Sequence, residues 1–205
     1  MPGTGNDIVA LAAINVERTN QANFYSKILS LSEQQLYAEF QPQLPFENFV
    51  WMAWSVKESV YKFLQKFTPG LVFSPTKIII TKLEFKVDFE NADMYKGIVQ
   101  YNNCTLYSRT IIAKDYIFSV VNFNYDFTNT YWGIKQISSS DHVYQSSEVR
   151  ELLLNDLHNL LPGNNFKIDK SAYGWPIVIK DEQEIPLAVS LAHHDRYVAY
   201  SIQLK

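Results

Sequence analysis

The stretch Trp54-Ser-Val-Lys57-Glu58-Ser-Val-Tyr61-Lys62 decides the fold of this chain. On a helix that turns by about 100° per residue, Glu58 and Lys62 share one face, one turn apart. The opposite face is apolar and is formed by Phe49, Ala53, Val56, Val60 and Phe63. This pattern predicts a long buried helix over residues 46–66, which follows two prolines and ends before Pro69-Gly70.

The charged face of this predicted helix also carries aromatic residues, namely Trp51, Trp54 and Tyr61. An acid and a base among large rings need partners, because burying an unpaired charge is costly. The spacing of Glu58 and Lys62 also fits an ordinary ion pair between residues four apart on an exposed helix. The helix alone therefore leaves two interpretations open, a functional site and a surface ion pair.

The rest of the chain predicts an α+β protein. Residues 7–14 form an apolar run that opens as a strand, and Ser32 followed by Glu33 is typical of a helix start. From Thr76 the apolar period changes to two, which predicts an antiparallel meander over 77–125 with turns at Asn102-Asn103 and Lys114-Asp115. A second amphipathic helix is expected over 145–161, and short strands near 166–168, 175–179, 187–191 and 197–204.

Bulk properties exclude several classes of protein. The 205 residues suit one domain, and a net charge of −3 argues against a broad nucleic-acid surface. No apolar run approaches the roughly 20 residues that span a bilayer, and the N-terminus lacks a signal-peptide layout, so we expect a cytoplasmic protein with no membrane partner. The one cysteine, Cys104, cannot form an intramolecular disulfide and lies far from any motif.

Two further segments flank the Lys-Glu helix: Gly5-Asn6-Asp7-Ile8-Val9 near the start, and Pro186-Leu-Ala-Val-Ser190-Leu191-Ala192-His193-His194 near the end. Together with Phe24-Tyr-Ser-Lys-Ile-Leu-Ser-Leu-Ser-Glu33, they resemble the 4'-phosphopantetheinyl transferase superfamily, in the motif order of its holo-acyl-carrier-protein synthase type. The resemblance covers residues 5–64 and 165–205. It departs from the family pattern at Ala192, where a serine is usual, and at Trp175, where many members have lysine.

The resemblance implies a 4'-phosphopantetheinyl transferase-like fold, a single domain over 1–205 in which a long helix packs on an antiparallel sheet, with 77–125 as an inserted β-meander. It implies Mg²⁺-dependent transfer of 4'-phosphopantetheine from coenzyme A to a serine of an apo acyl or peptidyl carrier protein. The implied roles are Mg²⁺ ligands for Asp7 and Glu58, catalysis for Glu58 and Lys62, and coenzyme A binding for Lys57, Lys62, Ser190 and His193. Lys57 lies about 100° from Glu58, so it contacts either phosphate or solvent. The proton acceptor is either Glu58 or a water on the metal.

Other interpretations remain open at this stage. A catalytically inactive relative that binds coenzyme A or a carrier protein would explain Ala192 and Trp175. A lipid binder built on the aromatic meander would leave the Glu58–Lys62 pair unexplained. Because each motif occurs once, the resemblance also implies a homotrimer in which His193 of one subunit completes the site of another, unless the meander makes the chain a monomer.

Overall fold

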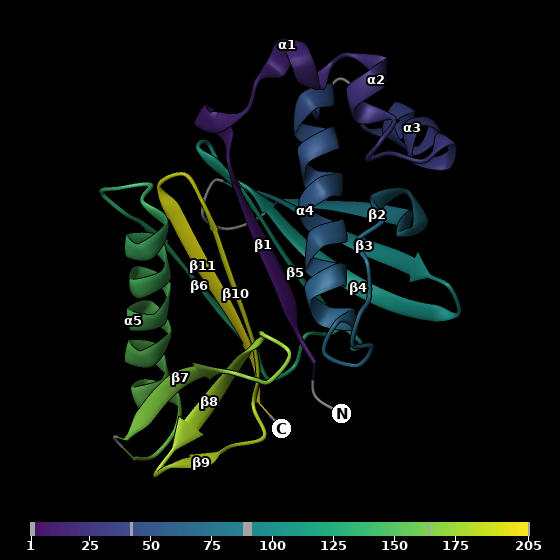
Figure 1. The fold of residues 1–205 in the computed structure, drawn as a ribbon. Helices are drawn as coiled ribbons and strands as arrows, with labels where there is room; N and C mark the ends of the chain where they lie inside the picture. Colours follow the sequence, from purple (N-terminus) through teal and green to yellow (C-terminus); the bar gives the residue numbers. More distant parts are fainter. Residues whose placement is uncertain (1–2, 42, 88–91, 164, 205) are drawn as a thin grey trace.

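The computed structural model describes residues 3–41, 43–87, 92–163 and 165–204. The chain forms two halves, each with one long helix against antiparallel strands (Figure 1). The elements of the first half are β1 (Gly5–Ala10), the 3-10 turn η1 (Leu11–Ala13), α1 (Val16–Thr19), α2 (Ala22–Tyr25), α3 (Leu31–Tyr37), η2 (Ala38–Phe40), α4 (Phe46–Leu64), η3 (Pro75–Lys77), β2 (Ile79–Val87), β3 (Asp93–Tyr101), β4 (Cys104–Ile112) and β5 (Tyr116–Asn122). Those of the second half are β6 (Thr130–Gln136), α5 (His142–Leu160), β7 (Phe166–Lys170), β8 (Pro176–Lys180), β9 (Gln183–Glu184), β10 (Ala188–His194) and β11 (Tyr197–Gln203).

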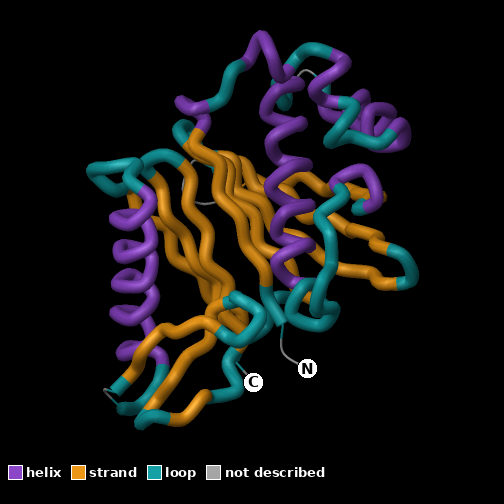
Figure 2. Tube along the Cα trace, in the orientation of Figure 1, coloured by secondary structure: helices purple, strands orange, loops and turns teal. Residues whose placement is uncertain are grey.

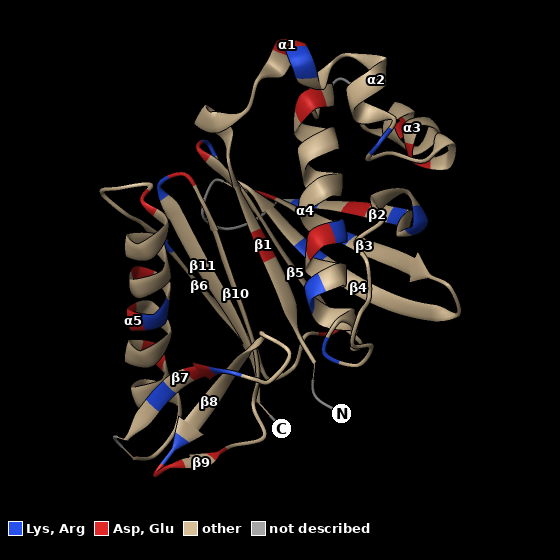
Figure 3. Cartoon of the chain, viewed as in Figure 1, with Lys and Arg blue, Asp and Glu red and all other residues tan. Residues whose placement is uncertain are grey.

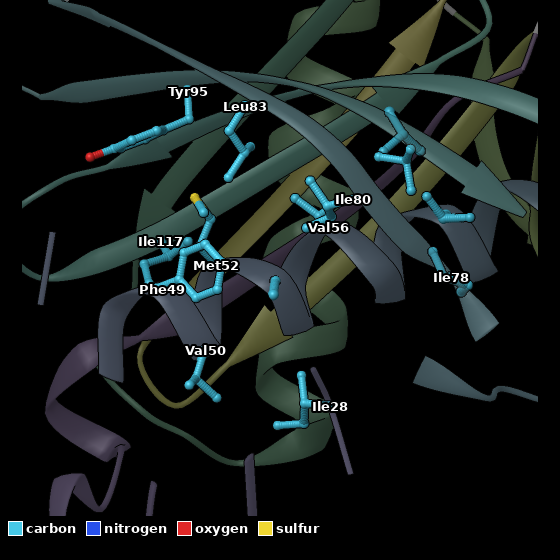
Figure 4. Packing of buried hydrophobic residues seen from close by; sticks show 14 of the residues in the cluster. Ile28, Phe49, Val50, Met52, Val56, Ile78, Ile80, Leu83, Tyr95 and Ile117 are labelled. Carbon is cyan, nitrogen blue, oxygen red and sulfur yellow. The ribbon is translucent and has the colours of Figure 1, made fainter. Parts of the chain in front are cut away.

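Helix α4 packs its apolar stripe on the larger sheet, as the sequence predicted. All five residues of the stripe are fully buried: Phe49, Ala53, Val56, Val60 and Phe63. Figure 4 shows Phe49, Met52 and Val56 of the helix among apolar side chains of the strands, such as Leu83 and Ile117. The helix begins after Pro45 and ends at Leu64, two residues earlier than expected.

The predicted meander is confirmed as β2 to β5, although residues 88–91 within it lie outside the described residues. The strand order is β1-β5-β4-β3-β2, with Gly5 paired to Val121 and Ala10 to Tyr116. The turn at Asn102 has a φ of 50°, a left-handed conformation that asparagine tolerates well. Because β5 pairs with β1, this segment forms the sheet that supports the start of the chain.

The second half was predicted less completely. Its described residues form two sheets, with the orders β10-β11-β6 and β7-β8-β9, and strands β6 and β9 were missed. Trp132 and Ile134 of β6 pack against the apolar core around Phe118 and Ala192. Gly133, between them, is needed because a Cβ there would lie 2.5 Å from the ring of Tyr200. Helix α5 starts at His142, three residues earlier than expected, because the Asp141 side chain accepts a hydrogen bond from the backbone N–H of Tyr144.

Strand β1 also runs beside β10, which joins the two halves (Figure 2). The two strands meet through side chains: the Asn6 N–H donates to Ser190 Oγ at 3.1 Å, and the Ala10 N–H donates to His194 Nδ1 at 2.9 Å. Behind this junction, Ile8 and Phe118 pack with Ala192 in a small apolar core. The halves therefore share β1, which is paired with β5 on one side and held by β10 on the other.

A buried ion pair fixes the helices at the start of the chain. Lys57 Nζ donates to Glu33 Oε2 at 2.7 Å and to the Ile28 carbonyl at 2.6 Å, and both charged side chains are fully buried. Glu33 also accepts the backbone N–H of Ser30 and that of Ile80. The helix cap is therefore Ser30, in a capping box with Glu33, and the expected start at Ser32 was wrong by two residues.

Replacing Lys57 should destabilise the fold strongly, because Glu33 would remain buried without its counter-charge. We expect Lys57→Met to lower the free energy of unfolding by about 3 kcal/mol or more in urea denaturation. Lys77→Met, at an exposed lysine, is the matched control and should leave stability unchanged. A Lys57→Met protein as stable as the control would refute this structural role.

Candidate functional site

The site begins with the close approach of β1 to α4. A Cβ on Gly5 would lie only 2.0 Å from the carbonyl oxygen of Ser59, so only glycine fits at this position. Because residues two apart in a strand share a face, Asp7 points the same way as Gly5, toward α4. This packing brings the Asp7 side chain to the charged face of the helix.

Lys62 lies between two carboxylates. Its Nζ is 3.1 Å from Asp7 Oδ1 and 3.3 Å from Glu58 Oε1. Figure 3 shows acidic and basic positions side by side on α4, facing an acidic position on β1. The Glu58–Lys62 pair thus exists as the sequence allowed, but it is more than a surface ion pair because a third charge joins it.

Burial shapes the electrostatics of this group. It raises the pKa of Asp7 to about 6; the Lys62 charge opposes this shift and the nearby Glu58 adds to it. Burial acts to lower the pKa of Lys62, but the two carboxylates outweigh it, so its pKa lies above the ordinary value. The second oxygen of Asp7, Oδ2, is buried and has no hydrogen-bond partner among the described residues. Such an atom is an available ligand position for a cation.

His193 lies near this group within the same chain. It is the last residue but one of β10, its ring centroid is 5.0 Å from that of His142, and the charge of Lys62 acts on it. Burial is the largest cause that lowers the pKa of His193, and the charges of His142 and Lys62 add to the effect. These effects favour the neutral form of His193, in which one ring nitrogen carries a proton that can be donated.

A hollow of about 270 Å³ extends from His193 along helix α5. Its lining carries the cationic groups Arg150 and Lys170, and its other residues include His142, Ser146, Gly174 and Pro176. With no carboxylate in the lining, this hollow suits an anionic ligand. The sequence analysis missed Arg150 and Lys170, although the polar stripe His142–Ser146–Arg150, at intervals of four residues on an amphipathic helix, was a usable signal.

A second, apolar hollow of about 450 Å³ lies one turn before Glu58 on α4. The ring of Trp54 forms part of its lining, with the Phe73 ring centroid 5.3 Å from that of Trp54. The exposed cations Arg18 and Lys27 also line it. Sequence reasoning placed Trp51 and Trp54 near the charged face but gave no sign of a cavity there.

Two predicted site residues do not reach the site. Lys57 was expected to contact phosphate or solvent, but it is fully buried and pairs with Glu33. Ser190 was expected to bind the cofactor, but it is 2% exposed and its hydroxyl accepts the Asn6 N–H. Both residues therefore stabilise the fold. The helix wheel and the motif gave the direction of each side chain, but not the partner that it meets.

Of the remaining predicted residues, Asp7 and Glu58 both contact Lys62, and the charges of Lys62 and Glu58 act on His193. The neighbouring His194 accepts the backbone N–H of Ala10. Among the described residues, no group of three or more His, Cys, Asp or Glu side chains is placed to hold a metal ion. Any metal here would thus have two protein carboxylates, Asp7 and Glu58, as its ligands.

In the part of the chain that the structure describes, no helix is both long enough and apolar enough to cross a membrane. Searches of curated proteins and of solved structures found no match to the chain. A family model for the 4'-phosphopantetheinyl transferase superfamily matches residues 3–119, more than half of the chain. The match includes β1, α4 and the three charged residues Asp7, Glu58 and Lys62. The chain therefore belongs to the 4'-phosphopantetheinyl transferase superfamily.

Proposed function

We propose that this protein transfers the 4'-phosphopantetheine group of coenzyme A to a serine of an apo carrier protein, with Mg²⁺. The observation that carries the proposal is Lys62 held between Asp7 and Glu58, beside a hollow lined by cations. The reaction forms a bond between the serine oxygen and phosphorus, and breaks the bond from phosphorus to the adenosine bisphosphate. Such transfers depend mainly on neutralising phosphate charge and on positioning.

The charged group fits a Mg²⁺ ion bound to phosphates. Mg²⁺ prefers oxygen ligands and is typically held by one or two carboxylates with phosphate oxygens and water. The unpartnered Oδ2 of Asp7 and the carboxylate of Glu58 supply such oxygens. When bound, the ion would neutralise charge that develops on the pyrophosphate. Lys62 adds a positive charge that can turn from the carboxylates toward a phosphate oxygen.

The nucleotide end of coenzyme A fits the hollow beside His193. Arg150 and Lys170 would neutralise a phosphate there, and the neutral His193 would donate one hydrogen bond. Of the two carboxylates, Glu58 is the more exposed, with 29% of its side chain accessible against 6% for Asp7. We therefore assign to Glu58 the removal of the proton from the incoming serine.

The carrier protein fits the apolar hollow beside Trp54. This hollow is one turn from Glu58, so a partner seated there would present its serine near the carboxylate. The exposed Arg18 and Lys27 favour an acidic partner with an apolar anchor residue. The cytoplasmic location stays a prediction.

The main alternative is an inactive relative that still binds coenzyme A or a carrier protein. Its sequence support was Ala192 and Trp175. Ala192 is 2% exposed and packs in the apolar core behind the junction, so a serine hydroxyl there would face apolar groups. Arg150 and Lys170 also provide positive charge in the hollow lined by Gly174 and Pro176, the chain neighbours of Trp175. These observations favour an active enzyme.

The function is tested by incubating the protein with apo carrier proteins, coenzyme A and Mg²⁺, and by mass spectrometry of the carrier. We expect phosphopantetheine addition by the wild type. Asp7→Asn and Glu58→Gln should each lower turnover at least about 100-fold, equivalent to about 2.7 kcal/mol, because each removes charge from the metal site. Near-normal turnover of either variant at saturating Mg²⁺ would exclude the assigned site.

The carrier-binding hollow predicts a defect confined to the protein substrate. Arg18→Glu should raise KM for the carrier about tenfold, because it places a like charge before an acidic partner, while KM for coenzyme A stays unchanged. Lys114→Glu, which makes the same charge change at an exposed lysine outside the lining of the hollow, is the control. Equal effects of both variants would show that only net charge matters.

The site also predicts that one chain suffices. Because His193 and Lys62 interact within a single chain, the reason for a homotrimer is lost, and we propose a monomer. Mixing inactive Glu58→Gln protein with inactive His193→Ala protein should restore no activity, and light scattering should give the mass of one chain. Partial recovery in the mixture would instead demonstrate sites shared between subunits.

A further inference from the structure

Lys66 connects three segments at the lower end of the site. It follows α4, and its Nζ donates to the carbonyl of Thr4 at 2.6 Å and to that of Val189 at 2.5 Å. Thr4 immediately precedes β1, and Val189 lies in β10. One ammonium group therefore ties the end of the helix to the strands that carry Asp7 and His193.

This ammonium group is in an unusual environment. Lys66 takes part in none of the ion pairs found among the described residues, and the charge that acts on it is that of Lys62, of the same sign. The neighbouring cleft of about 300 Å³ is lined mainly by apolar residues, and Glu184 is the acidic residue in its lining. Burying this ammonium group with two carbonyls as its partners among the described residues costs free energy. A contribution to the geometry of the site would offset this cost.

The carbonyls of Thr4 and Val189 belong to the segments that position Asp7 and His193. Val189 precedes Ser190, which receives the Asn6 N–H, so fixing Val189 fixes the register of β10 against β1. Thr4 is three residues before Asp7 on the same chain segment. We propose that Lys66 is a positioning residue that clamps β1 and β10 to the end of α4 and so sets His193 against Asp7, Glu58 and Lys62.

The charge state of Lys66 provides a readout. Burial lowers its pKa to about 7, and Lys62 adds to the effect. Above this pH the free enzyme loses the charge, and hydrogen bonds from a neutral amine are weaker than those from an ammonium. Burial also raises the pKa of Asp7 to about 6, while the pKa of His193 lies below its usual 6.5 and that of Lys62 above 10.5. A decline of kcat/KM above pH 7 is assigned to Lys66 when Lys66→Arg, which keeps its charge, lacks it.

The first test, which rests on the proposed transferase function, compares kcat/KM for coenzyme A across pH in wild type, Lys66→Met, Lys66→Arg and the control Lys77→Met. We expect wild type and control to decline above about pH 7, since kcat/KM reports the free enzyme. Lys66→Arg should retain activity at higher pH because its guanidinium stays charged. Lys66→Met should be about 10- to 100-fold less active at pH 6.5 and lack the decline, because its site is misplaced.

The second test does not require activity. Hydrogen exchange of the protein without coenzyme A should be faster in residues 188–194 of Lys66→Met than of wild type, with α5 unchanged and Lys66→Arg intermediate. If the wild type transfers no phosphopantetheine, the proposed function is wrong. The hydrogen-exchange measurement then tests by itself whether Lys66 holds β1 and β10 in place. Lys66→Met with wild-type exchange in 188–194 would overturn the proposal, as would a lower Tm combined with an unchanged pH profile.

Discussion

The structure depends on the position of β1 between two sheets and under one helix. Its ladder with β5 places it in the larger sheet, its other edge is held by side chains of β10, and Gly5 lets α4 approach within contact of its backbone. Any side chain at Gly5 would push the helix away from the strand. Asp7 would then lose Lys62, and the charged group would separate into its parts.

The charges of the molecule fall into two kinds that look alike in sequence. Lys57 and Glu33 form a closed pair whose hydrogen-bonding atoms are taken up by each other and by backbone groups. Asp7, Glu58 and Lys62 form an open group, with one carboxylate oxygen unmatched and part of Glu58 accessible. Two acids around one base leave a net negative charge, which a divalent cation would balance. Lys57 and Glu58 are adjacent in one helix but have different roles: Lys57 stabilises the fold, and Glu58 belongs to the charged group of the proposed site.

The sequence was sufficient for features that follow from periodicity. The buried stripe of α4, the meander and the contact of Glu58 with Lys62 all follow from spacing along one element. Partners across the fold were not accessible in this way. The burial of Lys57 depends on Glu33, 24 residues away, and the role of Ser190 depends on Asn6 at the other end of the chain. Arg150 belongs to a helix stripe with His142 and Ser146 that could have been read, whereas Lys170 is a single charge on a short strand and carries no pattern. The sequence also could not show that the second half folds back on β1.

The junction of β1 and β10 has a mechanical consequence. Ser190 and His194 are four residues apart, as are Asn6 and Ala10. The two side chains of β10 therefore accept hydrogen bonds from two backbone N–H groups of β1 at the same spacing. A shift of either strand by one residue would bring Leu191 and Asp195, or Val189 and His193, to these two positions. Because successive side chains of a strand project from opposite faces, the two hydrogen bonds would be lost. Among the described residues, no backbone ladder joins these two strands. The junction of β1 and β10 therefore fixes one register with few hydrogen bonds. Separating the two halves at this junction would leave the sheets on both sides intact.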